Sequence, residues 1–233
     1  MNLCVIPARG GSKRIPRKNV RLFCGKPMLV WALEAASKSE CFDEIIVSSD
    51  DEEILAIAEA YKGVTPLLRP AALADDYAST TSVVGHAIEL QTDLGQKPSF
   101  ICCLYPTAAF VSIDDLRTGL ESIARNFSDF VVPVTTFEYP IQRALALNTS
   151  GFLEMVDSDQ YGKRSQDLEP RLHDAGQFYW GTVNAWLSGK PILHSNSVPI
   201  IIPRYRCSDI DTMEDWYQAE LLFTILRERG LFC

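Results

Sequence analysis

Residues Leu3-Cys-Val-Ile-Pro-Ala8 form a short apolar run, and Arg9-Gly-Gly-Ser-Lys-Arg-Ile-Pro-Arg-Lys-Asn19 follows it directly. This order predicts a buried strand that runs into a glycine-rich basic loop. Glycine lets the backbone approach phosphate oxygens closely, and consecutive N–H groups there can form a nest for an anion. A solvated basic turn is the alternative, because blocks of like charge are often only that. The apolar strand before the loop and its paired glycines favour a phosphate-binding loop.

Charge is distributed unevenly along the chain. The first 33 residues carry seven basic side chains and no acidic one, whereas the rest carries 15 basic against 30 acidic side chains, for a net charge of −8. A cationic segment on an anionic body indicates a site for a small polyanion, and argues against a nucleic-acid surface, which needs a broad basic face. We expect no membrane contact, since no apolar stretch reaches the ~18 residues of a membrane span. The first apolar run is also too short for a signal peptide.

The seven cysteines are an odd number and include no Cys-x-x-Cys pair. They predict reduced thiols in a cytoplasmic protein, mostly buried as small apolar side chains.

Strand and helix signals alternate along the chain. We expect strands at 3–8, 44–49, 64–69, 100–105, 130–135 and 198–203, and helices at 27–38, 52–62, 80–94, 113–124 and 211–229. Short connections between alternating elements predict one α/β domain over 1–233, with a mainly parallel, Rossmann-like sheet and helices on both faces. Ligands on such sheets bind beyond the carboxyl ends of the strands, where the basic loop leaves the first strand.

Residues 137–177 break this alternation. The segment is polar, has turn signals at 149–151 and 169–171, and is too long for a plain loop in a compact domain. We expect a dimerisation arm, inserted within the domain, that packs on the partner subunit of a homodimer. Regular structure should resume over 177–186.

The basic loop matches neither of two common nucleotide-binding motifs. It lacks the GxxxxGK[ST] order of a P-loop and the GxGxxG order of a dinucleotide-binding turn. We therefore expect the N–H groups of residues 10–12, with Arg9 and Lys18, to hold a nucleoside triphosphate. Arginine grips paired oxygens through its planar fork, and lysine offers a compact charge.

Asp209 and Asp211 stand two residues apart just before the last predicted helix. On an extended segment their side chains point to the same side. Mg²⁺ takes one or two carboxylates together with water and substrate phosphates. Asp211 also fits a helix N-cap, with Glu214 three residues later as in a capping box. Both roles can hold together, and Asp209 has no such structural explanation.

A third candidate group lies between residues 172 and 181. His173 and Asp174 are suited to orient a sugar, and the following aromatic residues Phe178, Tyr179 and Trp180 are suited to stack on one. The alternative is an aromatic cluster in the core or between subunits, which we favour for Phe178 and Trp180.

Residues 6–19 resemble the N-terminal signature of the CMP-sialic acid synthetases, the acylneuraminate cytidylyltransferases. Arg69-Pro70 with Asp75–Thr81 looks like the base-and-ribose segment of that family, and Asp209-Ile-Asp211 looks like its metal pair. The similarity covers nearly the whole chain in order. The family usually reads Gln-Pro-Thr-Ser-Pro-Leu-Arg after the fourth strand, whereas this chain reads Leu104-Tyr-Pro-Thr-Ala-Ala-Phe110. The run 174–180 instead resembles the branch that activates pseudaminic acid, a nine-carbon 2-keto acid with a methyl group at C9.

This resemblance implies a cytoplasmic, Mg²⁺-dependent nucleotidyltransferase. Its substrates would be CTP and pseudaminic acid (a nonulosonic acid), its products CMP-pseudaminic acid and pyrophosphate, and it would serve flagellin or surface-glycan modification in a bacterium. Arg9, Lys18, Asp209 and Asp211 would be catalytic, the two aspartates as Mg²⁺ ligands. The implied nucleotide-binding residues are Ala8, Arg9, Gly10, Gly11, Ser12, Lys13, Lys18, Asn19, Arg69, Thr80 and Ser82. The implied sugar-binding residues are His173, Gln177 and Tyr179, and the arm cations Lys163, Arg164 and Arg171 are candidates to reach the partner's site.

Other functions stay open at this point. N-acetylneuraminate or legionaminate are alternative substrates. A non-catalytic nucleotide-sugar binding protein on the same fold would not need Asp209 and Asp211. A glycosyltransferase with these aspartates as its metal site would give no reason for the basic loop.

Overall fold

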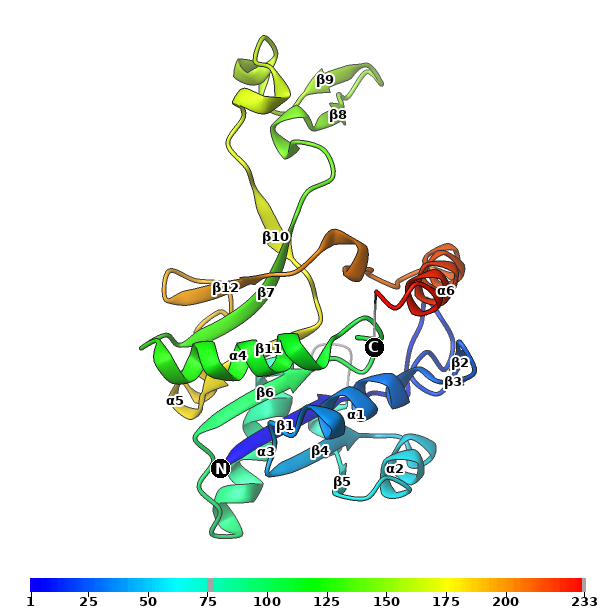
Figure 1. Ribbon diagram of the computed structural model, residues 1–233, viewed down its shortest axis with the longest axis vertical. Coiled ribbons are helices and arrows are strands. Elements are labelled where there is room, and N and C mark those ends of the chain that lie inside the picture. The colour runs from blue at the N-terminus through cyan, green and yellow to red at the C-terminus, as the bar shows by residue number, and fades with distance from the viewer. Residues whose placement is uncertain (75–77, 232–233) are drawn as a thin grey trace.

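The computed structural model describes residues 1–74 and 78–231, and an eight-stranded sheet forms the centre of the described chain (Figure 1). Its strands are β1 (Asn2–Pro7), β4 (Glu44–Ser49), β5 (Val64–Leu68), β6 (Phe100–Leu104), β7 (Phe130–Thr136), β10 (Leu172–Asp174), β11 (Phe178–Thr182) and β12 (Ser197–Ile201). The helices are α1 (Met28–Ser39), α2 (Glu52–Glu59), α3 (Thr80–Asp93), α4 (Ile113–Arg125), α5 (Val183–Leu187) and α6 (Met213–Glu228). Two small hairpins complete the fold, β2 (Leu22–Phe23) with β3 (Lys26–Pro27), and β8 (Leu145–Leu147) with β9 (Leu153–Met155). Each expected strand and helix is present, with small shifts of its ends.

The sheet is mixed, which corrects the expectation of a mainly parallel sheet. The order is β10-β7-β11-β6-β1-β4-β5, and β12 also pairs with β7. β1 is parallel to β4 and β6, and β5 is parallel to β4, as expected. However, β11 runs antiparallel to β6 and β7, and β10 runs antiparallel to β7. The chain leaves β7 into the arm and returns without a crossover helix, so the returning strands run in the opposite direction.

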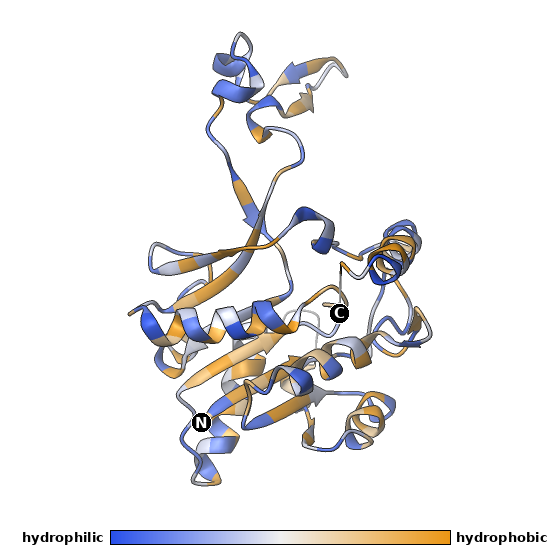
Figure 2. Cartoon of the chain, in the orientation of Figure 1, coloured by the Kyte–Doolittle hydropathy of each residue, from blue (hydrophilic) through white to orange (hydrophobic). Residues whose placement is uncertain are grey.

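Helices cover both faces of the sheet, as expected. Successive residues of β1 point to opposite faces. Cys4 and Ile6 pack in a core with α1, α2 and α4, whereas Leu3 and Val5 pack in a second core with α3 and α5. Figure 2 shows the apolar residues gathered along the central strands, with hydrophilic residues on the outward sides of the helices. The buried strands thus give the loops at their carboxyl ends a rigid base.

A third core ties α6 to the basic loop. Ile15 from the middle of that loop is fully buried and packs with Phe110, Trp216 and Phe223. Phe23 of β2 lies among the same aromatic rings, with its centroid 5.4 Å from that of Trp216 and 5.3 Å from that of Phe223. The first and last parts of the chain are therefore fixed against each other.

The expected arm is an excursion from the main sheet. It spans residues 137–171, because β10 already pairs with β7 through the register of His173 opposite Thr135. Its hairpin β8–β9 lies far from the sheet in Figure 1. Apolar side chains on the arm are exposed to solvent: Leu147 and Phe152 are each 71% exposed, and Tyr161 is 82% exposed.

The thiols follow the sequence expectation in large part. Cys4, Cys41, Cys102 and Cys103 are buried, and none of the six cysteines within the described ranges is in a disulfide. Burial raises the pKa of Cys103, so this thiol stays protonated and unreactive. Over residues 1–74 and 78–231, we find no helix with the length and apolar character needed to cross a membrane.

Candidate active site

The basic loop leaves β1 at the carboxyl edge of the parallel strands, as predicted. The N–H of Ala8 donates to the carbonyl of Ser48 at 3.0 Å, so the loop starts against β4. Asn19 closes the loop, because its side-chain Nδ2 donates to the carbonyl of Arg9 at 2.9 Å and only 7% of the residue is exposed. Asn19 thus fixes the two ends of the loop to each other, and its contact with nucleotide stays a prediction.

The loop and the Asp209-Ile-Asp211 segment meet. The Nζ of Lys18 lies 3.7 Å from Oδ1 of Asp211, and Nη1 of Arg14 lies 2.5 Å from Oδ2 of the same carboxylate. Lys18 is largely buried, and burial lowers its pKa below the usual value, while Asp211 and Asp209 oppose that shift. Residues almost 200 positions apart in sequence thus form one charged cluster.

Asp211 does not cap α6, which corrects the alternative role given to it. The N-cap is Thr212, whose hydroxyl accepts from the N–H of Asp215 at 3.2 Å, and Asp215 returns the contact to the N–H of Thr212 at 2.7 Å. The capping box is therefore shifted by one residue from the Asp211–Glu214 pair expected. Ile210 is buried in the third core, so the flanking Asp209 and Asp211 project away from it.

Two adjoining cavities lie along this cluster. One, of about 600 Å³, follows the basic loop and is lined by Pro7, Arg9, Ser12, Lys13, Arg14, Lys18, Asn19, Tyr105, Pro106, Thr107 and Asp211. The other, of about 560 Å³, is lined by Lys18, Tyr105, Thr107, Ala108, Phe110, 173–177, Tyr179 and 207–211. Lys18, Tyr105, Thr107 and Asp211 line both, so they stand at the junction. The arrangement is a cleft with a cationic half and a half lined by aromatic and polar groups.

The residues predicted for the sugar all line the second cavity. The hydroxyl of Tyr179 donates to Oδ2 of Asp174 at 2.6 Å, and Nδ1 of His173 lies 2.9 Å from the carbonyl of Asp174. Gln177 is only 3% exposed, and its Nε2 donates to the carbonyl of Arg206. A carbonyl only accepts, so this contact fixes the orientation of the Gln177 amide. In this geometry Gln177 braces the segment that leads to Asp209.

Tyr105 was not among the predicted site residues. It follows directly after β6, and its hydroxyl lies 3.4 Å from Oγ1 of Thr80, which brings that predicted residue to the cleft. The Tyr105 ring stands edge-on to the Tyr179 ring, with centroids 5.5 Å apart. Burial raises the pKa of Tyr105, so its hydroxyl is a neutral hydrogen-bond donor. Its place at the carboxyl end of a parallel strand was the sequence signal that could have identified it.

Arg69 and Ser82 serve the local structure. Arg69 is 7% exposed and donates to the carbonyl of Ser48 at 2.8 Å and to that of Leu73 at 3.4 Å. Ser82 donates to the carbonyl of Ser79 at 2.8 Å, at the start of α3. Neither is among the described residues that line the two cavities. Residues 75–77, part of the expected base-and-ribose segment, lie outside the described chain.

The chemistry of the carboxylate pair fits a magnesium ion that would also bind substrate. No group of three or more His, Cys, Asp or Glu side chains in the described ranges forms a complete protein cage. Mg²⁺ does not need such a cage, because it keeps waters and takes substrate phosphates beside one or two carboxylates. Asp209 and Asp211 are hard oxygen donors that line one cavity, which suits this chemistry.

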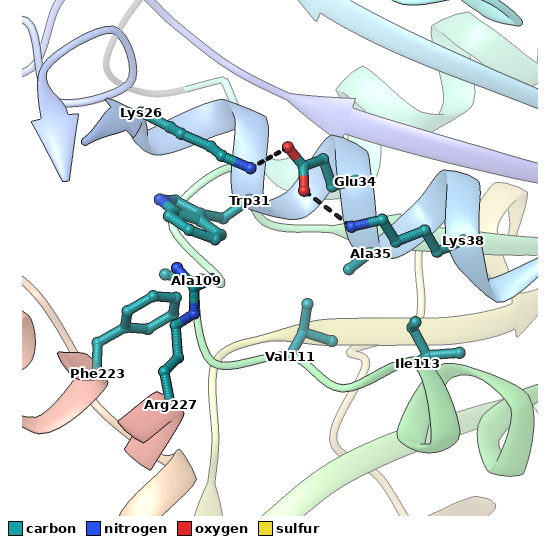
Figure 3. Close-up of a pocket in the computed structure, with 10 residues that line it drawn as sticks. All are labelled: Lys26, Trp31, Glu34, Ala35, Lys38, Ala109, Val111, Ile113, Phe223 and Arg227. Atoms are coloured by element: carbon teal, nitrogen blue, oxygen red, sulfur yellow. Dashed lines mark hydrogen bonds and ion pairs between the residues drawn. The ribbon is translucent and has the colours of Figure 1, made fainter. Parts of the chain in front are cut away.

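Another cavity of about 340 Å³, here named the Trp31 cavity, lies between α1, α6 and residues 109–113 (Figure 3). Its charged groups pair within the cavity wall. Glu34 binds both Lys26 and Lys38, and the cations Lys26 and Arg227 lie over the Trp31 ring. None of the predicted site residues lines it.

The chain is similar to known cytidylyltransferases. The profile of the Cytidylyltransferase family matches residues 3–228. The pseudaminic acid cytidylyltransferase of Campylobacter jejuni is 46% identical, over 97% of this chain and 98% of the relative. The N-acylneuraminate cytidylyltransferase of Escherichia coli is 32% identical over 98% of this chain and 52% of the relative. A CMP:2-keto-3-deoxy-manno-octonic acid synthetase solved with CTP has a TM-score of 0.68 at 17% identity, covering 96% and 98% of the two chains. This chain belongs to the cytidylyltransferase family.

Proposed function

We propose that the protein transfers CMP from CTP to pseudaminic acid and releases pyrophosphate. The observation that carries this proposal is the 46% identity to the Campylobacter jejuni enzyme over nearly the full length of both chains. The geometry agrees, because the cleft has a cationic half for a triphosphate and a second half for a sugar, joined at Lys18 and Asp211.

On the nucleotide side, Arg9, Lys13 and Lys18 are the cations that hold the triphosphate, with Ser12 beside them. The anomeric hydroxyl oxygen of the sugar forms a bond to the α-phosphorus of CTP in line, the hydroxyl proton passes to solvent, and the bond from phosphorus to the pyrophosphate oxygen breaks. Negative charge develops on the phosphoryl oxygens and on the leaving group. Fixed cations at the junction, which stabilise this charge, therefore account for most of the rate enhancement. Lys18 is suited to this because its side chain is 15% exposed and directed at the junction.

Asp209 and Asp211 are the residues that would hold Mg²⁺. When bound, the ion neutralises phosphate charge and orients the triphosphate. Arg14 and Lys18 share Asp211 and keep its carboxylate directed into the cleft.

On the sugar side, Tyr179 and His173 face the second cavity, and Asp174 accepts from Tyr179. Pseudaminic acid carries hydroxyl and acylamino groups together with a methyl group, so a wall with both aromatic and polar groups suits it. Gln177 lines the same cavity with its Nε2 bound to the carbonyl of Arg206, while its buried Oε1 has no hydrogen-bond partner among the described residues and is the atom that would accept from the sugar.

The arm supports a homodimer. Its exposed apolar side chains are Tyr139, Ile141, Leu145, Leu147, Phe152, Leu153, Val156 and Tyr161. An apolar surface of this kind marks an interface, and a second copy is the partner proposed here. Lys163, Arg164 and Arg171 lie on the same excursion, where they could meet the anionic substrates of the partner. Measurement of the molar mass in solution tests the dimer.

The buried, unpaired thiols suit a cytoplasmic location, which we include in the proposal.

The proposed reaction is tested by pyrophosphate release from CTP and Mg²⁺ with pseudaminic, N-acetylneuraminic and legionaminic acid in parallel. Release with pseudaminic acid alone supports the proposal. Release with N-acetylneuraminic acid alone, as the Escherichia coli relative at 32% identity would suggest, overturns the sugar assignment and keeps the family chemistry. CTP binding without turnover on any of these acids would favour a non-catalytic nucleotide-sugar binding protein.

A further inference from the structure

The residue before Lys18 has an unusual backbone conformation. Arg17 has φ of 58°, one of three non-glycine residues with positive φ in the described ranges. A side chain makes this left-handed conformation costly, so the surroundings must hold it in place. Two turn hydrogen bonds do so in part, from the N–H of Val20 at 3.0 Å and of Arg21 at 2.9 Å to the carbonyl of Arg17.

The Arg17 guanidinium adds a second constraint. It binds the carboxylates of Asp51 and Glu53 at the start of α2, with Nη2 3.2 Å from Oδ1 of Asp51. Asp51 is itself fixed as the N-cap of α2, because Oδ1 accepts from the N–H groups of Glu53 and Ile54. A planar fork between two carboxylates fixes direction as well as distance. We name this set of contacts the Arg17 bridge.

The same helix start also anchors the beginning of the loop. The N–H of Gly10 donates to Oδ1 of Asp50 at 3.0 Å. A Cβ at Gly10 would lie 2.5 Å from Oδ2 of Asp51, so a larger residue would push the loop off α2. Glycine at position 10 is thus explained by close approach to Asp51, besides any role toward phosphate. The loop is held at both ends by the start of α2.

Arg17 and Lys18 are neighbours that bind different parts of the molecule. Arg17, in the left-handed conformation, pairs with the start of α2, whereas the next side chain, Lys18, reaches Asp211. We propose that Arg17 is a positioning residue for the reaction, whose bridge to Asp51 and Glu53 fixes Lys18 at the junction of the two halves of the cleft. This inference rests on the proposed function, and it gives Asp51 and Glu53 at the start of α2 a role in positioning Lys18.

The test compares Arg17→Ala and Glu53→Gln with the control Glu52→Gln. Glu52 lies in the same first turn and loses the same charge, but it is not part of the Arg17 bridge. Affinity for CTP by calorimetry, kcat, the KM values for both substrates and the melting temperature are measured for each variant. We expect Arg17→Ala to lower kcat/KM for CTP by about 10- to 100-fold, since displacing a reacting group by about 1 Å can cost that much. Glu53→Gln should have a smaller effect in the same direction, and Glu52→Gln should match the wild type.

A purely structural role of Arg17 gives a different pattern. It would lower the melting temperature and leave kcat and the KM for CTP within twofold of the wild type, which would overturn the inference. The double variant Arg17→Ala/Glu53→Gln provides a second criterion. If Glu53 acts through Arg17, the kcat/KM of the double variant equals that of Arg17→Ala. If instead the losses of kcat/KM from the two single variants multiply, Glu53 acts independently of Arg17 and the inference is overturned.

The conservative variant Arg17→Lys separates charge from direction. Lysine keeps the positive charge but lacks the planar fork of arginine. A kcat/KM for CTP between those of Arg17→Ala and the wild type supports the Arg17 bridge. A kcat/KM no higher than that of Arg17→Ala contradicts a role for the ion pair. Failure of the proposed function is recognised separately. In that case the wild type itself releases no pyrophosphate, and the CTP affinities of the same variants still decide whether Arg17 positions Lys18.

Discussion

The cleft and the Trp31 cavity hold their charged groups in opposite ways. In the Trp31 cavity, Glu34 pairs with Lys38 four residues later and with Lys26 eight residues earlier. In the cleft, Arg14 reaches Asp211 across 197 positions of sequence. The first arrangement can form within one helix and the hairpin before it, whereas the second exists only after the third core has joined α6 to the loop. Distant segments meet at both cavities, since Arg227 of α6 lies over Trp31 of α1. The sequence separation of the ion pairs, more than cavity volume, therefore distinguishes the cleft.

The largest expected effect comes from Asp209→Asn. The variant removes one charge and keeps the shape of the side chain, so residue 209 would hold Mg²⁺ less well. Turnover should fall by about 100- to 1,000-fold, the usual cost of losing electrostatic stabilisation of a transition state. The melting temperature should stay within a few degrees, because Asp209 is exposed and does not cap α6. Pyrophosphate release and thermal unfolding measure the two quantities.

A normal rate of pyrophosphate release by Asp209→Asn would contradict this expectation. It would mean that Asp209 in the cleft, like Glu34 in the Trp31 cavity, contributes to the structure and not to turnover.

The next effect, on the sugar side, comes from Tyr179→Phe. The change removes the donor to Asp174, a hydrogen bond of 2.6 Å to a charged acceptor, and such bonds contribute about 1.5–3 kcal/mol. Asp174 lines the second cavity and not the one along the basic loop. If the second cavity takes the sugar, as proposed, KM for pseudaminic acid should rise roughly tenfold while KM for CTP stays within about twofold. Steady-state kinetics with each substrate varied in turn measure this. An equal rise in both KM values would contradict the division of the cleft into two halves.

Much of the fold was predictable because its signals are local. The apolar run before Arg9, the acidic start of α2 and the alternation of strands with helices follow from short stretches of sequence. The antiparallel direction of β10 and β11 could not be predicted, because strands of three to five residues have the same composition whichever way they run. Strand direction there depends on the arm, whose path is a property of the whole chain.

The site residues divide in the same way. Residue type indicated Arg9, Lys18, Asp209 and Asp211, which the fold brings to adjoining cavities. It could not show which of the predicted residues also support the local structure, as Gln177 does through its bond to the carbonyl of Arg206.

The helix cap is a similar case. The sequence offers two overlapping capping boxes, one beginning at Asp211 and one at Thr212. In the folded chain Asp211 pairs with the distant Arg14, and Thr212 takes the cap.

A smaller effect concerns the pH dependence of the Arg17 bridge. The hydrogen bond from Arg17 holds the pKa of Asp51 below its usual value of 3.8. A lowered carboxyl pKa adds stability that is fully present above the unfolded value and is lost as the pH falls through the folded value. The stability difference between wild type and Arg17→Ala should therefore be greatest near pH 7 and shrink below about pH 4. Urea unfolding across this range measures it, and a difference that grows in acid would contradict the ion pair.

The smallest expected effect, Glu34→Gln in the Trp31 cavity, provides the strictest test of the comparison. The variant removes both local ion pairs, and because Glu34 is partly solvated the loss should be about 0.5 kcal/mol, or a decrease of about 1–2 °C in melting temperature. Burial alone would raise the pKa of Glu34, but the hydrogen bonds from Lys26 and Lys38 outweigh it and the pKa is lowered. The stability difference should accordingly fade as the pH drops below about 4.5. Pyrophosphate release should stay within about twofold of the wild type. A tenfold loss of turnover would mean that α1 and α6 transmit a change at this cavity to Asp211, and sequence separation would then no longer distinguish the two sites.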